Sequence, residues 1–143
     1  MKKVIFNFAV IISLIFVSCT TPTNRGTESY EEEMTQGGII VYEKDGHGLV
    51  AAPKDLGRMT WDDAMSACNN LELNGYSDWH LPTKKELNTL YQNMVRVGGF
   101  ANSTYWSSTV TNDNDAWFQF FDDGLQSFST KSYNFTVRAV RAF

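Results

Sequence analysis

The pattern of apolar and polar positions is most informative over residues 75–91. Pro82 fixes its own φ and disfavours a helical conformation at the residue before it, so residues 79–81 are expected to be extended. Thr83 with Glu86 three residues later matches a capping box, which satisfies free N–H groups at the start of a helix. Apolar residues then recur at helical spacing and form one stripe: Leu87, Leu90, Tyr91 and Met94. The pattern predicts a helix of about three turns that needs a partner surface.

A hairpin is predicted at the start of the folded part. Two strand-like runs, residues 39–42 and 48–52, flank the dipeptide Asp45-Gly46, which is a strong signal for a tight turn. Residues 53–59 are expected to be a loop.

A second helix is predicted between this hairpin and the proline. Thr60 with Asp63 indicates its capped start, and Asn74-Gly75 is expected to close it. Its apolar face consists of Ala64, Met65, Cys68 and Leu71.

The last third of the chain has a composition typical of β-strands, following a break at Gly98-Gly99. Four short strands are predicted, joined by turns rich in Asn, Asp and Gly: residues 105–109, 116–121, 126–130 and 137–143. Short connections favour an antiparallel meander. The predicted class is α+β, with two helices packed on a small twisted antiparallel sheet and the N-terminal hairpin pairing near the last strand.

The composition indicates one domain. The chain has 143 residues, of which 43% are hydrophobic and 14% aromatic, enough for a single substantial core. We expect this domain to occupy residues 37–143.

The N-terminus has the features of a secretory leader. A basic start is followed by an apolar run over residues 4–17 that is too short for a permanent membrane span. Residues 16–19, Phe-Val-Ser-Cys, resemble the cleavage box of bacterial lipoproteins. We therefore predict a signal peptide over residues 1–18 and lipidation of Cys19. The alternative is an ordinary signal peptide cut elsewhere, with Cys19 an incidental thiol.

Residues 19–36 are predicted to be a lipidated flexible tether, because they contain almost no apolar side chains to offset the entropy of ordering. Removal of the leader leaves ten basic and sixteen acidic residues, the wrong balance for binding a phosphate backbone. We expect no nucleic-acid partner and attachment to a membrane through the lipid. The expected location is the cell envelope, at the outer membrane or cell surface of a Gram-negative bacterium.

Residues typical of catalysis are scarce in the sequence. If Cys19 carries lipid, Cys68 has no partner and is expected to be a small hydrophobic residue on the inner side of its helix. His47 and His80 have no spacing that suggests a zinc site, and neither a G-x-S-x-G element nor a glycine-rich phosphate loop is present. We expect a protein that is not an enzyme.

Six motifs occur in an order that resembles a known family. They are Gly37-Gly38-Ile39, Trp61-Asp62-Asp63-Ala64, the run from Gly75 to Thr83, Glu86-Leu87, Tyr105-Trp106-Ser107-Ser108-Thr109 and Val137-Arg138-Ala139-Val140-Arg141. Over about residues 37–143 the chain resembles the C-terminal domain of Legionella collagen-like protein, long described as a domain of unknown function. The resemblance implies a C-type-lectin-like fold, related to that of formylglycine-generating enzymes, on bacterial secreted and surface proteins. Those enzymes depend on two active-site cysteines, whereas this domain has Cys68 alone.

The motif residues are interpreted first as architecture. Three residues of the connection between the two helices are expected to dock it onto the domain: Trp79, His80 and Pro82. Three large aromatic residues are expected to dominate the core: Trp61, Trp106 and Trp117. Arg138 and Arg141 are expected to be buried or half-buried and to pair with carboxylates or backbone carbonyls. Glu86 has two candidate roles, the capping box or a partner for an arginine.

One polar cluster is a candidate ligand site: Asn112, Asp113, Asn114 and Asp115, with Asp122 and Asp123 across the next strand. Calcium takes about six to eight oxygen ligands, so Asp113 and Asp115 are candidate calcium ligands. The alternative is a turn rich in Asn and Asp, residues that tolerate turn geometry. The tripeptides that set sugar specificity in C-type lectins are absent.

Exposed aromatic residues near this loop, Tyr105 and Tyr133, complete the expected contact surface, because aromatic faces can stack on sugar rings. The sequence thus favours a lipid-anchored binding or adhesion module that recognises glycans, with calcium as the one candidate cofactor. The alternative is a structural lipoprotein that docks onto a larger envelope protein assembly and has no small ligand.

Overall fold

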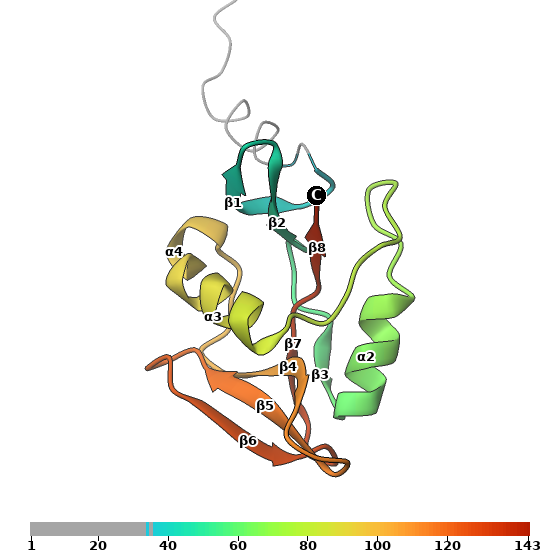
Figure 1. The fold of residues 1–143 in the computed structure, drawn as a ribbon, viewed down its shortest axis with the longest axis vertical. Helices are drawn as coiled ribbons and strands as arrows, with labels where there is room; N and C mark the ends of the chain where they lie inside the picture. The colour runs from blue at the N-terminus through green and yellow to red at the C-terminus, as the bar shows by residue number, and fades with distance from the viewer. Residues whose placement is uncertain (1–33, 35) are drawn as a thin grey trace, which may run out of the picture.

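Two β-sheets and three helices make up the part of the chain that the computed structural model describes, which is residue 34 and residues 36–143 (Figure 1). In chain order the elements are β1 (Ile39–Lys44), β2 (His47–Ala51), β3 (Gly57–Met59), α2 (Trp61–Asn69), α3 (Lys84–Gln92), α4 (Met94–Val97), β4 (Thr104–Val110), β5 (Asp115–Phe120), β6 (Gln126–Thr130), β7 (Phe135–Val137) and β8 (Val140–Ala142). The α+β class is confirmed. The predicted leader, Cys19 and nearly all of the predicted tether lie outside the described residues.

The two sheets share the C-terminal segment of the chain. One has the order β1-β2-β8, and the other has the order β3-β7-β4-β5-β6. The strands pair antiparallel except for a parallel contact between β4 and β7. The pairing of β2 with β8 confirms that the N-terminal hairpin returns to the last strand. Asp45 and Gly46 form the hairpin turn with positive φ angles of 54° and 78°, as two-residue hairpin turns require.

The strand predicted over residues 137–143 is two strands. β7 ends at Val137 and belongs to the larger sheet, whereas β8 begins at Val140 and belongs to the smaller one. A run of alternating residues cannot reveal such a change of sheet, because both strands keep the same period. The predicted loop over residues 53–59 also contains β3, which is a strand because its three residues pair with β7.

The helix boundaries differ from those predicted. α2 ends at Asn69, well before Asn74-Gly75, which instead forms a tight turn in which Leu73 and Tyr76 exchange backbone hydrogen bonds of 3.0 Å. The apolar stripe predicted for the helix after Pro82 is split, because α3 ends at Gln92 and Met94 begins α4.

Two hydrophobic clusters fill the spaces between these layers. The first lies between α2 and the larger sheet and contains Trp79, Leu81 and Trp106. The second lies between α3, β1 and β2 and contains Leu87 and Leu90. Both clusters lie entirely within residues 37–143, so this part contains its own core. Among the described helices, none is long and apolar enough to cross a membrane.

Candidate binding surface

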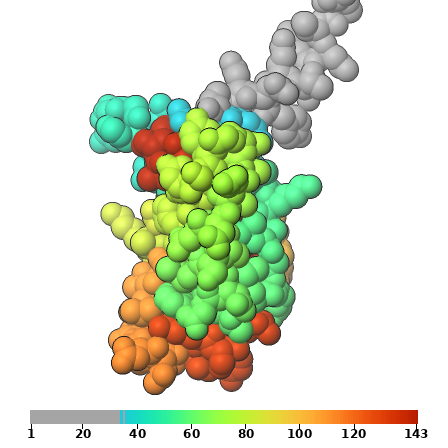
Figure 2. All heavy atoms as spheres, turned by 90° about the vertical axis from the view of Figure 1, so that its right-hand side faces the viewer, coloured from blue at the N-terminus to red at the C-terminus, as the bar shows by residue number. Residues whose placement is uncertain are grey.

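Three segments from different parts of the sequence meet at one end of the molecule. They are the loop over residues 111–114, the turn over residues 131–134 and the start of α2 at Trp61, and together we call them the strand-end surface. In Figure 1 the loop and the turn lie side by side at the bottom, and in Figure 2 their orange and red-orange atoms lie below the green atoms of α2. The meander brings them together because β4–β5 and β6–β7 connections leave the sheet at the same end.

Lys131 fastens these segments to one another. Its backbone N–H donates to the carbonyl of Asn114 and its Nζ donates to the carbonyl of Asp113, both at 2.9 Å. The Nζ also lies 4.3 Å from the ring centroid of Trp61, and the backbone N–H of Trp61 donates to the carbonyl of Lys131. The positions of the loop and of the turn are therefore coupled through one side chain.

The loop itself is an Asx-type turn. Asn112 Oδ1 accepts hydrogen bonds from the backbone N–H groups of Asn114 at 2.8 Å and of Asp115 at 2.9 Å. Asn112 Nδ2 donates to Asp115 Oδ2 at 3.0 Å. The amide of Asn112 and one oxygen of Asp115 are thus used to hold the turn. No hydrogen bond to another described residue joins the side chain of Asp113 or of Asn114.

The acidic residues that the sequence suggested as one cluster lie at two ends of β5. Asp122 and Asp123 are in the turn between β5 and β6, where their carboxylates accept from the backbone N–H groups of Asp123 and Leu125. Asp113 and Asp115 are at the opposite end. Over residues 36–143, no group of three or more His, Cys, Asp and Glu side chains could hold a metal ion.

The two aromatic residues expected at the contact surface have different environments. Tyr133 is 57% exposed and its ring stacks on Phe135 with centroids 6.1 Å apart. Tyr105 is fully buried, so the expectation that it is an exposed contact residue is wrong. Its position on a central strand points it into the core, where its hydroxyl donates to Asp55 Oδ2 and accepts from the N–H of Ala101.

An aromatic and cationic contact that the sequence analysis did not identify lies on the face of β5 and β6 nearest α3. Lys84 Nζ lies 3.0 Å from the ring centroid of Trp117, whose ring packs edge-on against Phe128. Gln126 Nε2 donates to the carbonyl of Lys84. The alternation of side chains along β5 could have indicated that Trp117 points to this face of the sheet. No local pattern could have placed Lys84 over its ring, because Lys84 lies at the start of α3, which is remote in the sequence.

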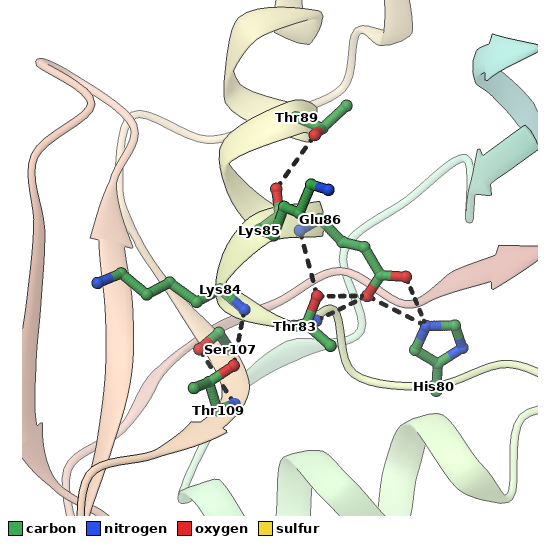
Figure 3. A network of polar contacts seen from close by, with 8 residues as sticks. All are labelled: His80, Thr83, Lys84, Lys85, Glu86, Thr89, Ser107 and Thr109. Carbon is green, nitrogen blue, oxygen red and sulfur yellow. Dashed lines mark hydrogen bonds and ion pairs between the residues drawn. The ribbon is translucent and has the colours of Figure 1, made fainter.

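His80 and Glu86 form a pair at the start of α3 (Figure 3). The capping box is confirmed, because Thr83 Oγ1 accepts from the N–H of Glu86 and Glu86 Oε2 accepts from the N–H of Thr83 at 2.8 Å. The same carboxylate lies 3.3 Å from His80 Nε2 and is not an arginine partner.

The ionisation of this pair follows from its contacts. Burial raises the pKa of Glu86, but the hydrogen bonds with His80 and Thr83 outweigh burial and lower that pKa to about 2. The hydrogen bond to Glu86 raises the pKa of His80, against an opposing effect of burial. His80 also joins the link to β8, since its backbone exchanges two hydrogen bonds with Val140.

Arg138 is buried in the core, as expected. Its Nε donates to Asp55 Oδ1 at 2.6 Å, and its Nη atoms donate to the carbonyls of Ala52, Gly98 and Gly99. Its guanidinium also lies 4.2 Å from the ring centroid of Phe100.

Arg141 makes the same kinds of contact nearer the surface, because the side chain of its partner Asp78 is 60% exposed. Its Nε pairs with Asp78, its Nη1 donates to the carbonyl of Gln36, and its guanidinium lies 3.8 Å from the ring centroid of Tyr76. The pairing predicted for both arginines is confirmed.

Two other features bear on the candidate chemistry. Burial raises the pKa of the Cys68 thiol to about 12, so this thiol stays protonated at neutral pH. Two hollows lie away from the strand-end surface, one of about 480 Å³ along residues 72–77 and one of about 300 Å³ between Phe100 and Phe121. Of the residues that the sequence placed in the candidate ligand cluster, Asp122 lines the second hollow and none lines the first.

Comparisons with known proteins identify the family. No curated protein matches the chain. Among solved structures, botrocetin is similar with 12% identity and a TM-score of 0.48 over 70% of this chain and 93% of that one. The snake venom toxin convulxin is similar with 16% identity and a TM-score of 0.43 over 71% and 92%. Likenesses this distant support no argument about function. The family model described as the Lcl C-terminal domain matches residues 40–141, and the chain therefore belongs to this family.

Proposed function

We propose that this protein is a lipid-anchored binding module of the bacterial cell envelope that recognises glycans through the strand-end surface. The observation that carries the proposal is Tyr133, whose ring is 57% exposed and stacks on Phe135, in the turn that Lys131 joins by hydrogen bonds to the polar loop over residues 111–114. An aromatic face beside fixed amide and carboxylate groups suits a sugar ring, which has an apolar face and a rim of hydroxyl groups.

The loop offers both free and fixed polar groups. Asn112 holds the turn, so the loop keeps its shape without a ligand. The carboxylate of Asp113 has no hydrogen bond to a described residue and is available to accept from a sugar hydroxyl. A calcium ion bound with oxygen atoms of Asp113 and Asp115 would need further ligands from the glycan or from water.

The anchor in this proposal is Cys19, in the segment that the sequence assigns to a lipoprotein leader and tether. Acyl chains on this cysteine would hold the domain at the outer membrane or cell surface. The acidic excess of the chain supports a partner other than nucleic acid.

The proposal is tested by glycan binding. Residues 34–143 are applied to a broad glycan panel in calcium and again with a chelator, alongside the variants Tyr133→Ala and Asp113→Ala. Tyr42→Ala is the matched control, because Tyr42 is an exposed tyrosine on a different sheet, with 46% of its surface accessible. We expect Tyr133→Ala to weaken binding about tenfold or more, since stacking contributes on the order of 1–2 kcal/mol.

Each outcome has a distinct meaning. Binding lost in chelator and in Asp113→Ala would establish a calcium-dependent site, whereas binding that persists in chelator would place recognition on Tyr133. Equal binding by Tyr133→Ala, Asp113→Ala and the native protein would refute this surface as the site.

A protein-docking role is the second candidate function. Two apolar side chains far from the strand-end surface are strongly exposed, Val95 at 92% and Leu125 at 63%. Single exposed apolar side chains are common on protein surfaces, so these two do not by themselves favour docking over glycan binding. No binding to any glycan, with or without calcium, would favour this function.

A further inference from the structure

The outer edge of β6 has backbone groups without a partner in the described part of the chain. Phe120 N–H donates to the carbonyl of Leu125, and Lys131 N–H donates to the carbonyl of Asn114. Because pairing alternates along an antiparallel strand, the N–H and C=O groups of Gln126 and Phe128 and the N–H of Thr130 point away from β5. In Figure 1, β6 is the outermost strand of its sheet, with no labelled element beyond it.

The other sheet edges of the described structure are protected. β1 has a register shift between Ile40 and Tyr42 and ends in the charged pair Glu43-Lys44, while β3 has three residues and an exposed arginine. β8 is covered by backbone hydrogen bonds with His80. β6 has none of these devices, because its five residues are uncharged and pair with β5 without a register shift. An unprotected edge of this kind is a template for another strand.

The sequence of β6 is nearly symmetric about its central residue. It reads Gln-Ser-Phe-Ser-Thr from 126 to 130, with Phe128 at the centre. A two-fold axis at Phe128 would place this residue opposite its own copy, Ser127 opposite Ser129, and Gln126 opposite Thr130. The outward backbone groups would then face each other in hydrogen-bonded pairs. Phe128 is 54% exposed, so its ring is free to contact the second ring.

The charges that flank β6 favour the antiparallel arrangement. Asp122 and Asp123 precede the strand and Lys131 follows it. Antiparallel pairing brings the acidic end of one copy toward Lys131 of the other, whereas parallel pairing would bring like charges together.

We propose that β6 is the interface of a two-fold homodimer, in which the two β6 strands pair antiparallel about Phe128 and join the two larger sheets into one. The partner is a second copy of this chain. This inference does not rest on glycan binding, because it is argued from the outward backbone groups of β6 and from Phe128, although Lys131 also belongs to the strand-end surface.

Charge substitution at the symmetry axis tests the pairing. Phe128→Lys and Phe128→Glu each place like charges opposite one another, whereas an equal mixture of the two variants places opposite charges there. Val95→Lys is the matched control, because Val95 is 92% exposed on α4. Light scattering and sedimentation are measured on residues 34–143 over a range of concentrations, with circular dichroism as the check of folding.

We expect the native domain and Val95→Lys to be dimers and each Phe128 variant to dissociate with a constant raised about tenfold or more. The mixture of Phe128→Lys and Phe128→Glu is expected to recover the dimer. A native domain that stays monomeric up to several hundred micromolar would overturn the proposal, as would a dimer that both single variants preserve.

Crosslinking of the full chain provides a second measurement that does not depend on the isolated domain. In the two-fold arrangement Phe128→Cys faces its own copy at a distance suited to a disulfide. Mild oxidation of cells or membranes that contain the full chain is expected to give a crosslinked dimer with Phe128→Cys and not with Val95→Cys. The native chain measures any background from Cys19, since Cys68 is buried. Equal crosslinking of the two variants would contradict the proposed pairing.

Discussion

Arg138 joins segments that are remote in the sequence into one buried network. Its side chain is fully buried, and it pairs with Asp55 and with three backbone carbonyls. The other oxygen of Asp55 accepts from the hydroxyl of Tyr105. Removing one member of such a network leaves the others buried without partners, which costs more than the pair itself contributes.

We expect Arg138→Ala to lower the free energy of unfolding by about 3–5 kcal/mol, since Asp55 would remain in the interior without its partner. Urea unfolding at neutral pH measures this loss. Arg58→Ala is the matched control and is expected to cost less than about 1 kcal/mol, because Arg58 is exposed on β3. A loss for Arg138→Ala as small as that of the control would contradict a structural role.

The sequence indicated the roles of the two arginines but not their partners. Arginines in the closing motif of the family are expected to be paired, whereas Asp55 is 83 positions from Arg138 and lies in a predicted loop. Asp78 is 63 positions from Arg141. Nothing in local spacing connects such residues, because the fold alone brings them together. The sequence also did not reveal the burial of Tyr105, because its hydroxyl partner Asp55 is likewise remote in the sequence.

The stability contributed by His80 is expected to depend on pH. Glu86 raises the pKa of His80 above its ordinary 6.5, so the folded protein holds the imidazole proton more tightly than the unfolded chain does. This stabilisation is fully present below pH 6.5 and is lost as the pH rises through the raised pKa. Because the pKa of Glu86 is lowered to about 2, its own contribution is present above pH 4.5 and is lost as the pH falls toward 2.

Urea unfolding of the native protein and of His80→Gln at pH 5.5 to 9 measures this dependence. We expect the difference in unfolding free energy to be largest near pH 6, to stay below about 1 kcal/mol because the pair is partly exposed, and to shrink toward pH 9. His47→Gln, at the exposed start of β2, is the control substitution. A difference that does not change with pH would rule out the ion pair as its source.

At the scale of elements, the starts of α2 and α3 were predicted correctly, whereas the separate helix α4 and several element ends were not. Both N-caps depend on a side chain and a backbone group three residues apart, so the sequence contains all the information. The end of α2 and the split between β7 and β8 depend on which surface the chain meets next. β3 is likewise a strand because β7 lies beside it.

The cap of α3 gives a prediction at this scale. Thr83→Ala is expected to lower the free energy of unfolding by about 1 kcal/mol, because it removes the acceptor for the N–H of Glu86 and frees the carboxylate that His80 contacts. Thr89→Ala on the same helix is the comparison, since the Thr89 hydroxyl bonds within the helix to the carbonyl of Lys85 (Figure 3). Alanine is the better helix former there, so its effect is expected within about 0.5 kcal/mol. Thermal and urea unfolding measure the stability of both variants. Equal losses of unfolding free energy for Thr83→Ala and Thr89→Ala would contradict the capping role.

The whole molecule depends on its last strand. β8 pairs with β2, exchanges backbone hydrogen bonds with the link at His80, and positions Arg141 against Asp78. The small sheet therefore closes only when the end of the chain is in place. The candidate surface is also a property of the whole fold, because the loop over residues 111–114 and the turn over residues 131–134 meet through the order of the strands.

Deletion of residues 140–143 is expected to abolish the cooperative unfolding transition, because it removes β8 and exposes the core beneath it. Deletion of residues 1–33 is the control and is expected to leave the transition unchanged, since both hydrophobic clusters lie in the retained part. Circular dichroism during heating distinguishes the two. A C-terminally truncated chain that still melts in one sharp step would show that the larger sheet folds without β8.

The contact between Arg141 and the carbonyl of Gln36 has a consequence for the direction in which the domain faces. It fixes the described N-terminal end beside β8, at the top of Figure 1, whereas the strand-end surface lies at the bottom. If the N-terminal segment is anchored as proposed, the strand-end surface lies at the end of the domain remote from the anchored segment. In that arrangement, a force between a bound ligand and the anchor would enter the domain beside the three-stranded sheet, where Arg141 contacts Gln36.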